Sequence, residues 1–230
     1  QGVEAVAVCL LHAYQNPRHE QAVRERLAEM LPEVSVSLSS DVLPEINEYA
    51  RTSTTVVNAY TKPLMERYLA NLEDNLQGQG LRGRLLVMLS SGGVASVETA
   101  ASYPVRVIES GPVGGAIMGQ RIKDLAGIRA AFAFDMGGTT AKLCLLLGDE
   151  PIRASEYEVA RVHRFKAGSG IPLKVPCVDL LEIGAGGGSI AGISPLGLLQ
   201  VGPESAGAAP GPACYGQGGE RPTVTDADLL

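Results

Sequence analysis

The sequence contains no tryptophan, 4% aromatic residues and only four cysteines among its 230 residues. These cysteines, Cys9, Cys144, Cys177 and Cys214, lie far apart and lack the paired short spacings of a zinc site. Three of them stand in or beside apolar runs, where a thiol behaves as a small hydrophobe. The pattern therefore favours buried, reduced thiols in a cytoplasmic protein over a disulfide framework.

Long apolar runs and clusters of positive charge are also missing. The run Val3–Leu11 soon gives way to polar residues, so nothing approaches the roughly 20 apolar residues that span a bilayer. Lys and Arg number 19 against 25 Asp and Glu, a formal charge of −6, without the basic footprint of a nucleic-acid binder. We therefore expect neither a membrane nor a nucleic acid as a partner. The hydrophobic content of 45% suffices for a core.

Both ends of the sequence predict a chain that continues beyond them. Gln1 opens almost directly into a predicted strand, with no initiator Met and no signal peptide. Thr225 and Asp226 resemble a helix N-cap close to the last residue. We therefore expect a central piece of a longer protein, truncated at both ends, in which a two-sided active site would be incomplete.

The first 83 residues predict alternating strands and helices. Val3–Leu11 and Val34–Leu38 have the composition of strands and flank an amphipathic helix at His19–Leu31, a βαβ order that predicts a parallel strand pair. A second amphipathic helix is expected at Pro63–Leu76. The polar, glycine-rich segment Gln77–Gly83 is the best candidate for a subdomain boundary.

Two other segments leave alternatives open. Residues 41–60 are less regular, and their charges Glu48 and Arg51 beside the hydroxyl run Thr52–Thr55 could line a cleft or begin a solvated helix. The predicted strand Leu85–Leu89 runs into Ser90–Gly93, which resembles a ligand loop at the carboxyl end of a strand. A purely structural turn explains that loop equally well.

The stretch from Ala131 to Leu147 organises the rest of the chain. Two apolar runs, Ala131–Phe134 and Leu143–Leu147, flank a polar centre and predict a buried β-hairpin with a polar tip. Lys142 follows the tip and could meet a phosphate or point into solvent.

The tip itself carries the residues of a phosphate cradle. Gly137 and Gly138 would let the backbone adopt positive φ and bring its N–H groups close to an anion. Thr139 and Thr140 add hydroxyl donors, and Asp135 could hold a hydrated Mg²⁺ beside the phosphates. A glycine-rich hairpin that merely turns is the alternative.

A helix of small residues precedes this hairpin. Residues 109–119 predict a Pro-initiated helix in which Gly114, Gly115, Ala116 and Gly119 permit close packing. A small-residue helix followed by an Asp-x-Gly-Gly-Thr hairpin resembles the connecting helix and second phosphate loop of the actin, Hsp70 and sugar-kinase ATPase superfold. That resemblance implies ATP as the ligand.

A second glycine-dense loop follows an apolar run at Val175–Glu182. Five glycines between Gly184 and Gly192 predict close backbone approach, either to a ligand or to another strand. No helix obviously follows, so the loop does not match a dinucleotide fingerprint. His163, a lone histidine in a polar segment, is expected at the surface rather than as a ligand.

The chain as a whole resembles the hydantoinase A/5-oxoprolinase family, with acetone-carboxylase subunits as relatives. The motifs that carry the resemblance are Glu48–Tyr60, Ser90–Gly93, Ser110–Gly115, Phe134–Lys142, Glu182–Ile190 and Val201–Tyr215. Together they are far more specific than any one of them, because the phosphate hairpin is shared across the superfold.

The resemblance implies an α/β protein of actin-like, ribonuclease-H-like topology, with mixed sheets and flanking helices. It divides the chain into the end of an N-terminal domain (1–57), a linking helix and linker (58–83) and an incomplete ATPase-type domain (84–230). It also implies that ATP and Mg²⁺ drive the opening of a cyclic amide, with a second, hydantoinase B-type hydrolytic subunit or domain and a homo-oligomer. The implied site has Asp135 as metal ligand, Asp135 and Thr139 as catalytic residues, and as nucleotide contacts Gly114, Gly115, Gly137, Gly138, Thr139, Thr140, Gly186 and Gly187.

Two parts of the family pattern are missing. The sequence has neither a first Asp-x-Gly-Gly-Thr hairpin nor a Gly-Gly adenosine segment, and it has Lys142 where members often carry Asp. A chain of this extent is therefore expected to be inactive alone. The competing functions are an ATP-dependent carboxylase subunit that acts on a ketone with bicarbonate, and a non-catalytic subunit or assembly module.

Overall fold

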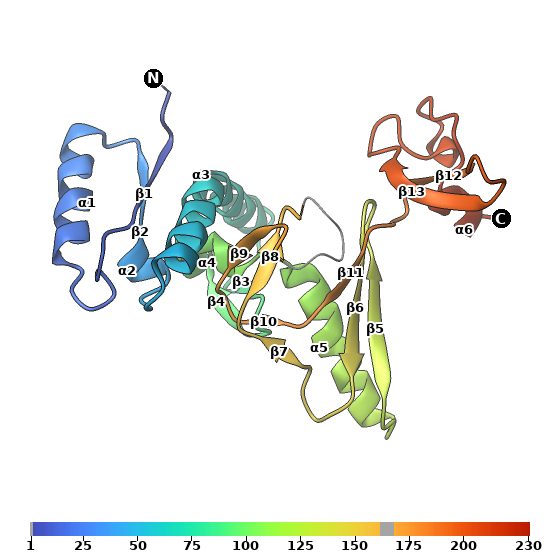
Figure 1. Cartoon of the computed structure of the whole chain (residues 1–230), viewed down its shortest axis with the longest axis horizontal. Coiled ribbons are helices and arrows are strands. Elements are labelled where there is room, and N and C mark those ends of the chain that lie inside the picture. Colours follow the sequence, from blue (N-terminus) through green and yellow to red (C-terminus); the bar gives the residue numbers. More distant parts are fainter. Residues whose placement is uncertain (1, 162–167) are drawn as a thin grey trace. The chain divides into compact units, whose positions relative to one another are not determined.

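The computed structural model describes residues 2–161 and 168–230, so His163 lies outside the described residues. The chain is an α/β protein with several small sheets (Figure 1). It divides into two compact units, one of Gln1–Val113 and Arg153–Val178, the other of Gly114–Ile152 and Asp179–Leu230. The expected domain boundaries at 57 and 83 stay predictions. Within the described residues, no helix has the length and hydropathy to cross a membrane.

The first unit opens with the predicted βαβ arrangement. Strand β1 (Ala5–Val8), helix α1 (Arg18–Met30) and strand β2 (Ser35–Leu38) follow one another. The two strands pair in parallel, with Ala5 opposite Ser35 and Val8 opposite Leu38. This prediction is confirmed.

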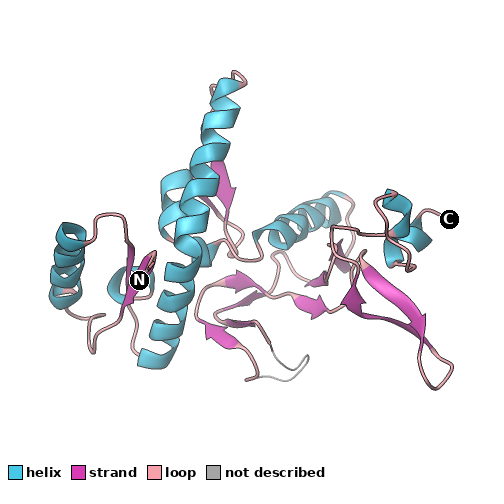
Figure 2. Ribbon diagram, turned by 90° about the horizontal axis from the view of Figure 1, so that it is seen from above, coloured by secondary structure: helices cyan, strands magenta, loops and turns pink. Residues whose placement is uncertain are grey.

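The next segment corrects the prediction of an irregular stretch. After the short helix α2 (Ser39–Val42), one continuous helix, α3 (Glu48–Gly78), covers the segment and runs through Pro63 (Figure 2). Asn47 caps its start by accepting a hydrogen bond from the Ala50 N–H at 3.2 Å. The Thr55 hydroxyl donates to the Arg51 carbonyl of its own helix at 2.7 Å, so the hydroxyl run is accommodated without breaking the helix.

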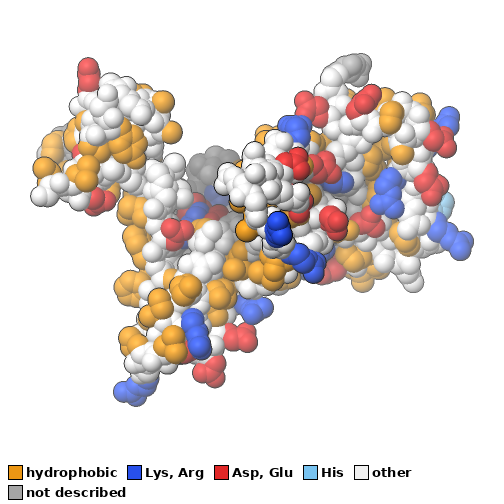
Figure 3. Space-filling model, turned by 180° about the vertical axis from the view of Figure 1, so that it is seen from behind, with side chains coloured by type: hydrophobic (Ala, Val, Ile, Leu, Met, Phe, Trp, Pro, Cys, Tyr) orange, Lys and Arg blue, Asp and Glu red, His pale blue; other side chains and the backbone are white. Residues whose placement is uncertain are grey.

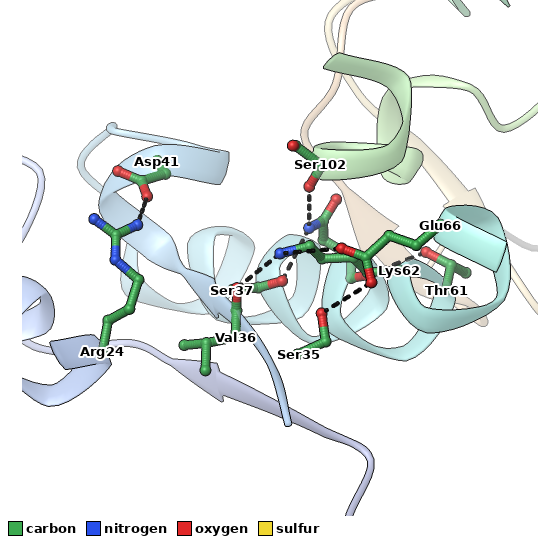
Figure 4. Close-up of polar contacts among 10 residues, drawn as sticks. Arg24, Ser35, Val36, Ser37, Asp41, Thr61, Lys62, Glu66 and Ser102 are labelled. Atoms are coloured by element: carbon green, nitrogen blue, oxygen red, sulfur yellow. Dashed lines mark hydrogen bonds and ion pairs between the residues drawn. The ribbon is translucent and has the colours of Figure 1, made fainter. Parts of the chain in front are cut away.

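The predicted solvated helix start is found in part: Glu48 and Thr52 of α3 are exposed, whereas Arg51 is buried. Arg51 is fully buried and donates to the backbone carbonyls of Leu10 (2.8 Å) and Glu45 (3.0 Å). Further along α3, Lys62 donates to the Val36 carbonyl at 3.0 Å, as Figure 4 shows. These contacts bind α3 to the strand pair and the loops around it.

The remaining elements of the first unit are short. Strands β3 (Leu86–Met88) and β4 (Val94–Ser96) form an antiparallel hairpin, followed by α4 (Val97–Ser102) and the 3₁₀ turn η1 (Pro104–Arg106). Strands β7 (Arg153–Ala154) and β10 (Cys177–Val178) pair with each other, as do β8 (Tyr157–Val159) and β9 (Ile171–Leu173). Their core contains Val42, Val105, Leu173 and Val175.

The second unit contains the predicted hairpin. Helix α5 (Ser110–Leu125), which begins in the first unit, is followed by β5 (Ala131–Met136) and β6 (Ala141–Leu146), and β11 (Leu181–Ile183) joins them in the order β11-β6-β5. A second hairpin consists of β12 (Ser189–Ile193) and β13 (Leu199–Ser205). The 3₁₀ turn η2 (Ala213–Tyr215) and helix α6 (Val224–Asp228) complete the unit.

The central hairpin is buried on one face only, which corrects the sequence prediction. Cys144 and Leu146 are 2% and 0% exposed, whereas Phe132 and Phe134 are 66% and 53% exposed. Alternate residues of a strand point to opposite faces, and apolar residues on both faces predict cover on both. The described chain covers one of them, and Figure 3 shows hydrophobic side chains, in orange, at the surface among the charged ones.

Candidate functional site

The tip of the β5–β6 hairpin is a tight turn. The Gly137 N–H donates to the Thr140 carbonyl at 2.9 Å and closes it. Neither Gly137 nor Gly138 adopts positive φ, contrary to the prediction, because this turn needs no left-handed residue. A Cβ placed on Gly138 would meet nothing within 4 Å. The backbone of Gly138 is thus open on the side that a side chain would occupy.

The second glycine loop packs directly on this tip. The N–H groups of Gly187 and Gly188 donate to the carbonyls of Gly137 and Gly138, at 2.9 and 2.7 Å. A Cβ on Gly186 would lie 2.5 Å from the Gly137 carbonyl oxygen and 2.6 Å from the Thr139 nitrogen. Of the two predicted partners for this loop, a ligand or another strand, the structure shows another backbone, since glycine alone permits so close an approach.

These hydrogen bonds give the tip a polarity. The carbonyls of Gly137 and Gly138 are occupied by the glycine loop. Among the described residues, no hydrogen bond is found from the N–H groups of Gly138, Thr139 and Thr140 or from the two threonine hydroxyls. The tip therefore offers hydrogen-bond donors to solvent while its carbonyl oxygens face the protein, an arrangement suited to an anion.

Asp135 lies just before the tip, in a row of charged side chains. It stands opposite Lys142 on β6, which in turn stands opposite Glu182 on β11. The Lys142 ammonium forms an ion pair with the Glu182 carboxylate, Nζ to Oε1 2.6 Å, and so does not simply point into solvent. In the described part of the chain, the Asp135 carboxylate has no hydrogen bond or ion pair, and no cluster of three or more His, Cys, Asp or Glu could hold a metal.

The small-residue helix contributes unevenly. A Cβ on Gly119 would lie 3.2 Å from both Ala133 Cβ and Leu146 Cδ1, so Gly119 permits the predicted close packing of α5 on the hairpin. Gly114 and Gly115 would meet nothing within 4 Å, so no packing contact in the described chain requires a glycine there. Their contact with a nucleotide stays a prediction.

A supporting layer behind the glycine loop was not predicted. The Gly187 carbonyl accepts from the Thr225 N–H at 2.9 Å, and the Gly188 carbonyl accepts from the Ala206 N–H at 2.8 Å. Helix α6 begins with a capping box in which Thr223 is the N-cap and Asp226 the third residue, two positions earlier than the predicted cap. The spacing Thr223-x-x-Asp226 was the signal that could have found it.

Asp226 also fixes the long coil before α6. Its carboxylate accepts from the Cys214 N–H at 2.7 Å and from the Thr223 N–H and hydroxyl, each at 2.8 Å. The hydrogen bond from the Cys214 backbone is the main cause that holds the pKa of this carboxyl well below its ordinary value. A glycine- and proline-rich segment whose composition alone could indicate disorder is thereby ordered.

The loop Ser90–Gly93 has a structural role. It is the turn of the antiparallel β3–β4 hairpin and not the end of a strand in a parallel sheet. The Ser90 side chain is buried, and its hydroxyl donates to the Arg106 carbonyl at 2.9 Å. Nearby, burial is the main cause that raises the pKa of the Tyr157 phenol. The structural turn is confirmed, and contact of this loop with a ligand stays a prediction.

Comparison with known proteins gives a consistent picture. A family model described as Hydantoinase/oxoprolinase matches residues 51–230, and one for the Hydantoinase/oxoprolinase N-terminal region matches residues 1–31. An uncharacterized protein of Methanocaldococcus jannaschii is 46% identical over 99% of the chain and 34% of its own length. The caprolactamase subunit alpha of Pseudomonas jessenii is 39% identical over 100% of the chain and 32% of its own length.

Two solved structures are also similar. A nucleotide-free structure of acetone carboxylase, studied for ATP-dependent acetone carboxylation, matches 98% of the chain and 31% of its own, with a TM-score of 0.78 and 27% identity. The crystal structure of the ATP-dependent caprolactamase of Pseudomonas jessenii matches 99% of the chain and 32% of its own, with a TM-score of 0.71 and 38% identity. The chain thus spans about a third of the length of these proteins.

Proposed function

Because the chain belongs to the hydantoinase/oxoprolinase family, we propose that it is the nucleotide-binding part of an ATP-dependent enzyme that opens a cyclic amide. The observation that carries the proposal is the polarity of the hairpin tip. Its carbonyls are occupied by the glycine loop, while the N–H groups of Gly138, Thr139 and Thr140 have no partner among the described residues. The relative named caprolactamase and the structure titled as an ATP-dependent caprolactamase support this reaction class.

The tip fits the phosphates of a nucleotide. Consecutive N–H groups in a turn form an anion-binding concavity, and the open space beside Gly138 lets an oxygen approach the backbone. The hydroxyls of Thr139 and Thr140 add two donors on the same turn. We assign the phosphate contacts to Gly137–Thr140, and further nucleotide contacts to Gly114, Gly115, Gly186 and Gly187.

Asp135 fits a magnesium ion of the kind that accompanies nucleotides. Mg²⁺ usually takes one or two protein carboxylates and completes its shell with waters and substrate phosphates. A single unpaired carboxylate beside the phosphate turn meets that requirement, and a cluster of acidic residues is not needed. Asp135 would hold the ion, and Thr139 would orient the phosphate next to it.

The nucleotide supplies the phosphoryl group that turns the oxygen of an unreactive amide into a leaving group. The role of this chain is to bind and orient the phosphates, because phosphoryl transfer depends mainly on positioning and on the neutralisation of charge. We extend the proposal to an actin-like ATPase topology for the longer protein, to a homo-oligomer and to a second, hydrolytic subunit. The printed name "subunit alpha" of a relative supports the last of these.

The test is ADP release by the full-length protein, with its partner subunit if one exists, from MgATP with hydantoin, 5-oxoproline or caprolactam. Asp135→Ala should abolish MgATP binding, measured by calorimetry. The matched control is Asp149→Asn, another exposed acidic residue of the same unit, which should bind as the unaltered protein does. An intact protein without affinity for MgATP would refute the proposal.

A second candidate is an ATP-dependent carboxylase acting on a ketone. The TM-score of 0.78 to acetone carboxylase favours it, whereas the higher sequence identity to caprolactamase, 38% against 27%, favours ring opening. ADP release with acetone only when bicarbonate is present would select the carboxylase. Release with a cyclic amide in the absence of bicarbonate would select the amide hydrolase.

A further inference from the structure

The start of helix α6 is bonded directly to the glycine loop behind the hairpin tip. Gly187 uses both of its backbone groups: its N–H donates to the Gly137 carbonyl at 2.9 Å, and its carbonyl accepts from the Thr225 N–H at 2.9 Å. A Cβ on Gly187 would lie 2.6 Å from the Thr225 hydroxyl oxygen, so the Thr225 side chain also packs against this glycine. Strand β12 continues the contact, since the Ala191 N–H donates to the Pro222 carbonyl at 2.8 Å. One residue of the loop therefore joins α6 to the tip.

The capping box of α6 keeps Thr225 in this place. The helix has five residues, too few to be stable through its own hydrogen bonds, so its start depends on contacts with the rest of the unit. The Asp226 carboxylate provides them: it accepts from the N–H and the hydroxyl of Thr223, each at 2.8 Å, and from the Cys214 N–H at 2.7 Å. Thr225 lies between the two residues of the box, and its N–H is therefore held where the Asp226 carboxylate fixes the turn.

We propose that Asp226 is a positioning residue for the phosphate turn, which it orients through Thr225 and Gly187. This inference rests on the proposed function, since it concerns the binding of phosphates at the tip. With Asp226 in place, the Thr225 N–H fixes the Gly187 carbonyl, and the Gly187 N–H occupies the Gly137 carbonyl that would otherwise repel an anion. Misplacing a binding group by about 1 Å can cost about a hundredfold, so a small shift of the loop is sufficient to weaken phosphate binding.

A positioning role and a purely structural role of Asp226 predict different results. If Asp226 orients the tip, its loss weakens binding of ligands that carry phosphates and leaves the binding of adenosine, which carries none, unchanged. If Asp226 only stabilises the fold, its loss lowers the unfolding midpoint, while the molecules that remain folded bind both ligands as before. Comparison of MgADP with adenosine therefore separates the two roles.

The experiment combines amide hydrogen exchange and calorimetry on the full-length protein. In Asp226→Ala without nucleotide, the amides of residues 186–191 should exchange at least about threefold faster. MgADP should bind about ten- to a hundredfold more weakly, and adenosine with unchanged affinity. Thr223→Val, which keeps the shape of this buried residue but removes its hydroxyl, should show smaller changes in the same direction, and Thr223→Ser should restore them. The matched control is Asp228→Ala, an exposed acidic residue of the same helix, which should change nothing.

Three results would overturn the inference: a glycine loop in Asp226→Ala that exchanges as in the unaltered protein, faster exchange with unchanged affinity for MgADP, or equal losses of affinity for MgADP and adenosine. The unfolding midpoint of each variant checks that it is folded at the temperature of the assay. If Asp226→Ala does not fold, the comparison of Thr223→Val with Thr223→Ser decides the same question. An unaltered protein without affinity for MgADP would refute the proposed function instead, and the exchange rates would still show whether Asp226 holds the loop.

Discussion

Replacing Gly186 by alanine tests how the glycine loop holds the hairpin tip. The new Cβ would lie 2.5 Å from the Gly137 carbonyl oxygen and 2.6 Å from the Thr139 nitrogen, where ordinary contacts begin at 3.4 Å. Both atoms belong to backbone, so the two loops must separate by about 0.9 Å, an overpacking that typically costs about 1–3 kcal/mol. The hydrogen bonds from Gly187 and Gly188, now 2.9 and 2.7 Å, would stretch past useful length.

Gly186→Ala is expected to lower both the free energy of unfolding and the affinity for MgADP. Two hydrogen bonds at about 1 kcal/mol each, together with the steric term of about 1–3 kcal/mol, predict a fall of about 3–5 kcal/mol in the free energy of unfolding. The displaced tip should also bind MgADP at least about tenfold more weakly. Urea denaturation and calorimetry on the full-length protein measure the two effects.

The matched control is Gly192→Ala on β12, where a Cβ would meet nothing within 4 Å. That variant should stay within about 0.5 kcal/mol of the unaltered protein. If Gly186→Ala were as stable as Gly192→Ala and bound nucleotide normally, the glycine loop would not position the tip, and the reasoning from its close approach would be wrong.

Three further predictions follow from single residues. Gly138→Ala has room for its Cβ and should leave the unfolding midpoint unchanged, while MgADP binding measured by calorimetry falls, because the methyl group occupies the side open to phosphate. Because the pKa of Asp226 is lowered, its hydrogen bond from Cys214 stabilises the fold fully at a pH above the ordinary carboxyl pKa of 3.8, and this contribution is lost as the pH falls below that value. Urea unfolding midpoints measured against pH should show this loss of stability in acid. Asp226→Asn should lack this pH dependence and should be less stable than the unaltered protein at pH 7. Arg51→Met removes the buried guanidinium and its two partly buried hydrogen bonds to the carbonyls of Leu10 and Glu45, and should cost about 2–6 kcal/mol of unfolding free energy. Arg67→Met, exposed on the same helix, should cost little.

The sequence predicted those elements whose signal is local. The β1–α1–β2 unit and the β5–β6 hairpin follow from apolar periodicity, and both are present, although β1 (Ala5–Val8) is shorter than the expected Val3–Leu11. The first half of α3 was missed because Thr52–Thr55 and Pro63 disfavour a helix in isolation. In the structure, tertiary burial of Arg51 and its neighbours outweighs that local preference.

The contacts that give the site its polarity could not be predicted, because each joins residues far apart in the sequence. The glycines at 186–188 predicted a close approach, but nothing in their pattern names the Gly137–Gly138 backbone as the partner. The sequence around Lys142 likewise did not identify Glu182 as an ion-pair partner, because only the structure places strand β11 beside β6. The capping box of Asp226 could be recognised from the local sequence. Its hydrogen bond from the Cys214 N–H could not, because no local pattern points to it.

Both glycine segments are needed to make the hairpin tip suitable for an anion. A turn that presents N–H groups to an anion also carries carbonyl oxygens, and these repel the same anion unless they point elsewhere and are neutralised. At Gly137 and Gly138 the second loop does this by donating its own N–H groups, and Gly186 provides the space for that approach. The second loop therefore need not touch a nucleotide to determine whether the first can bind one. This predicts that variants of Gly186–Gly188 lower affinity for every nucleotide carrying the same phosphates, whatever its base.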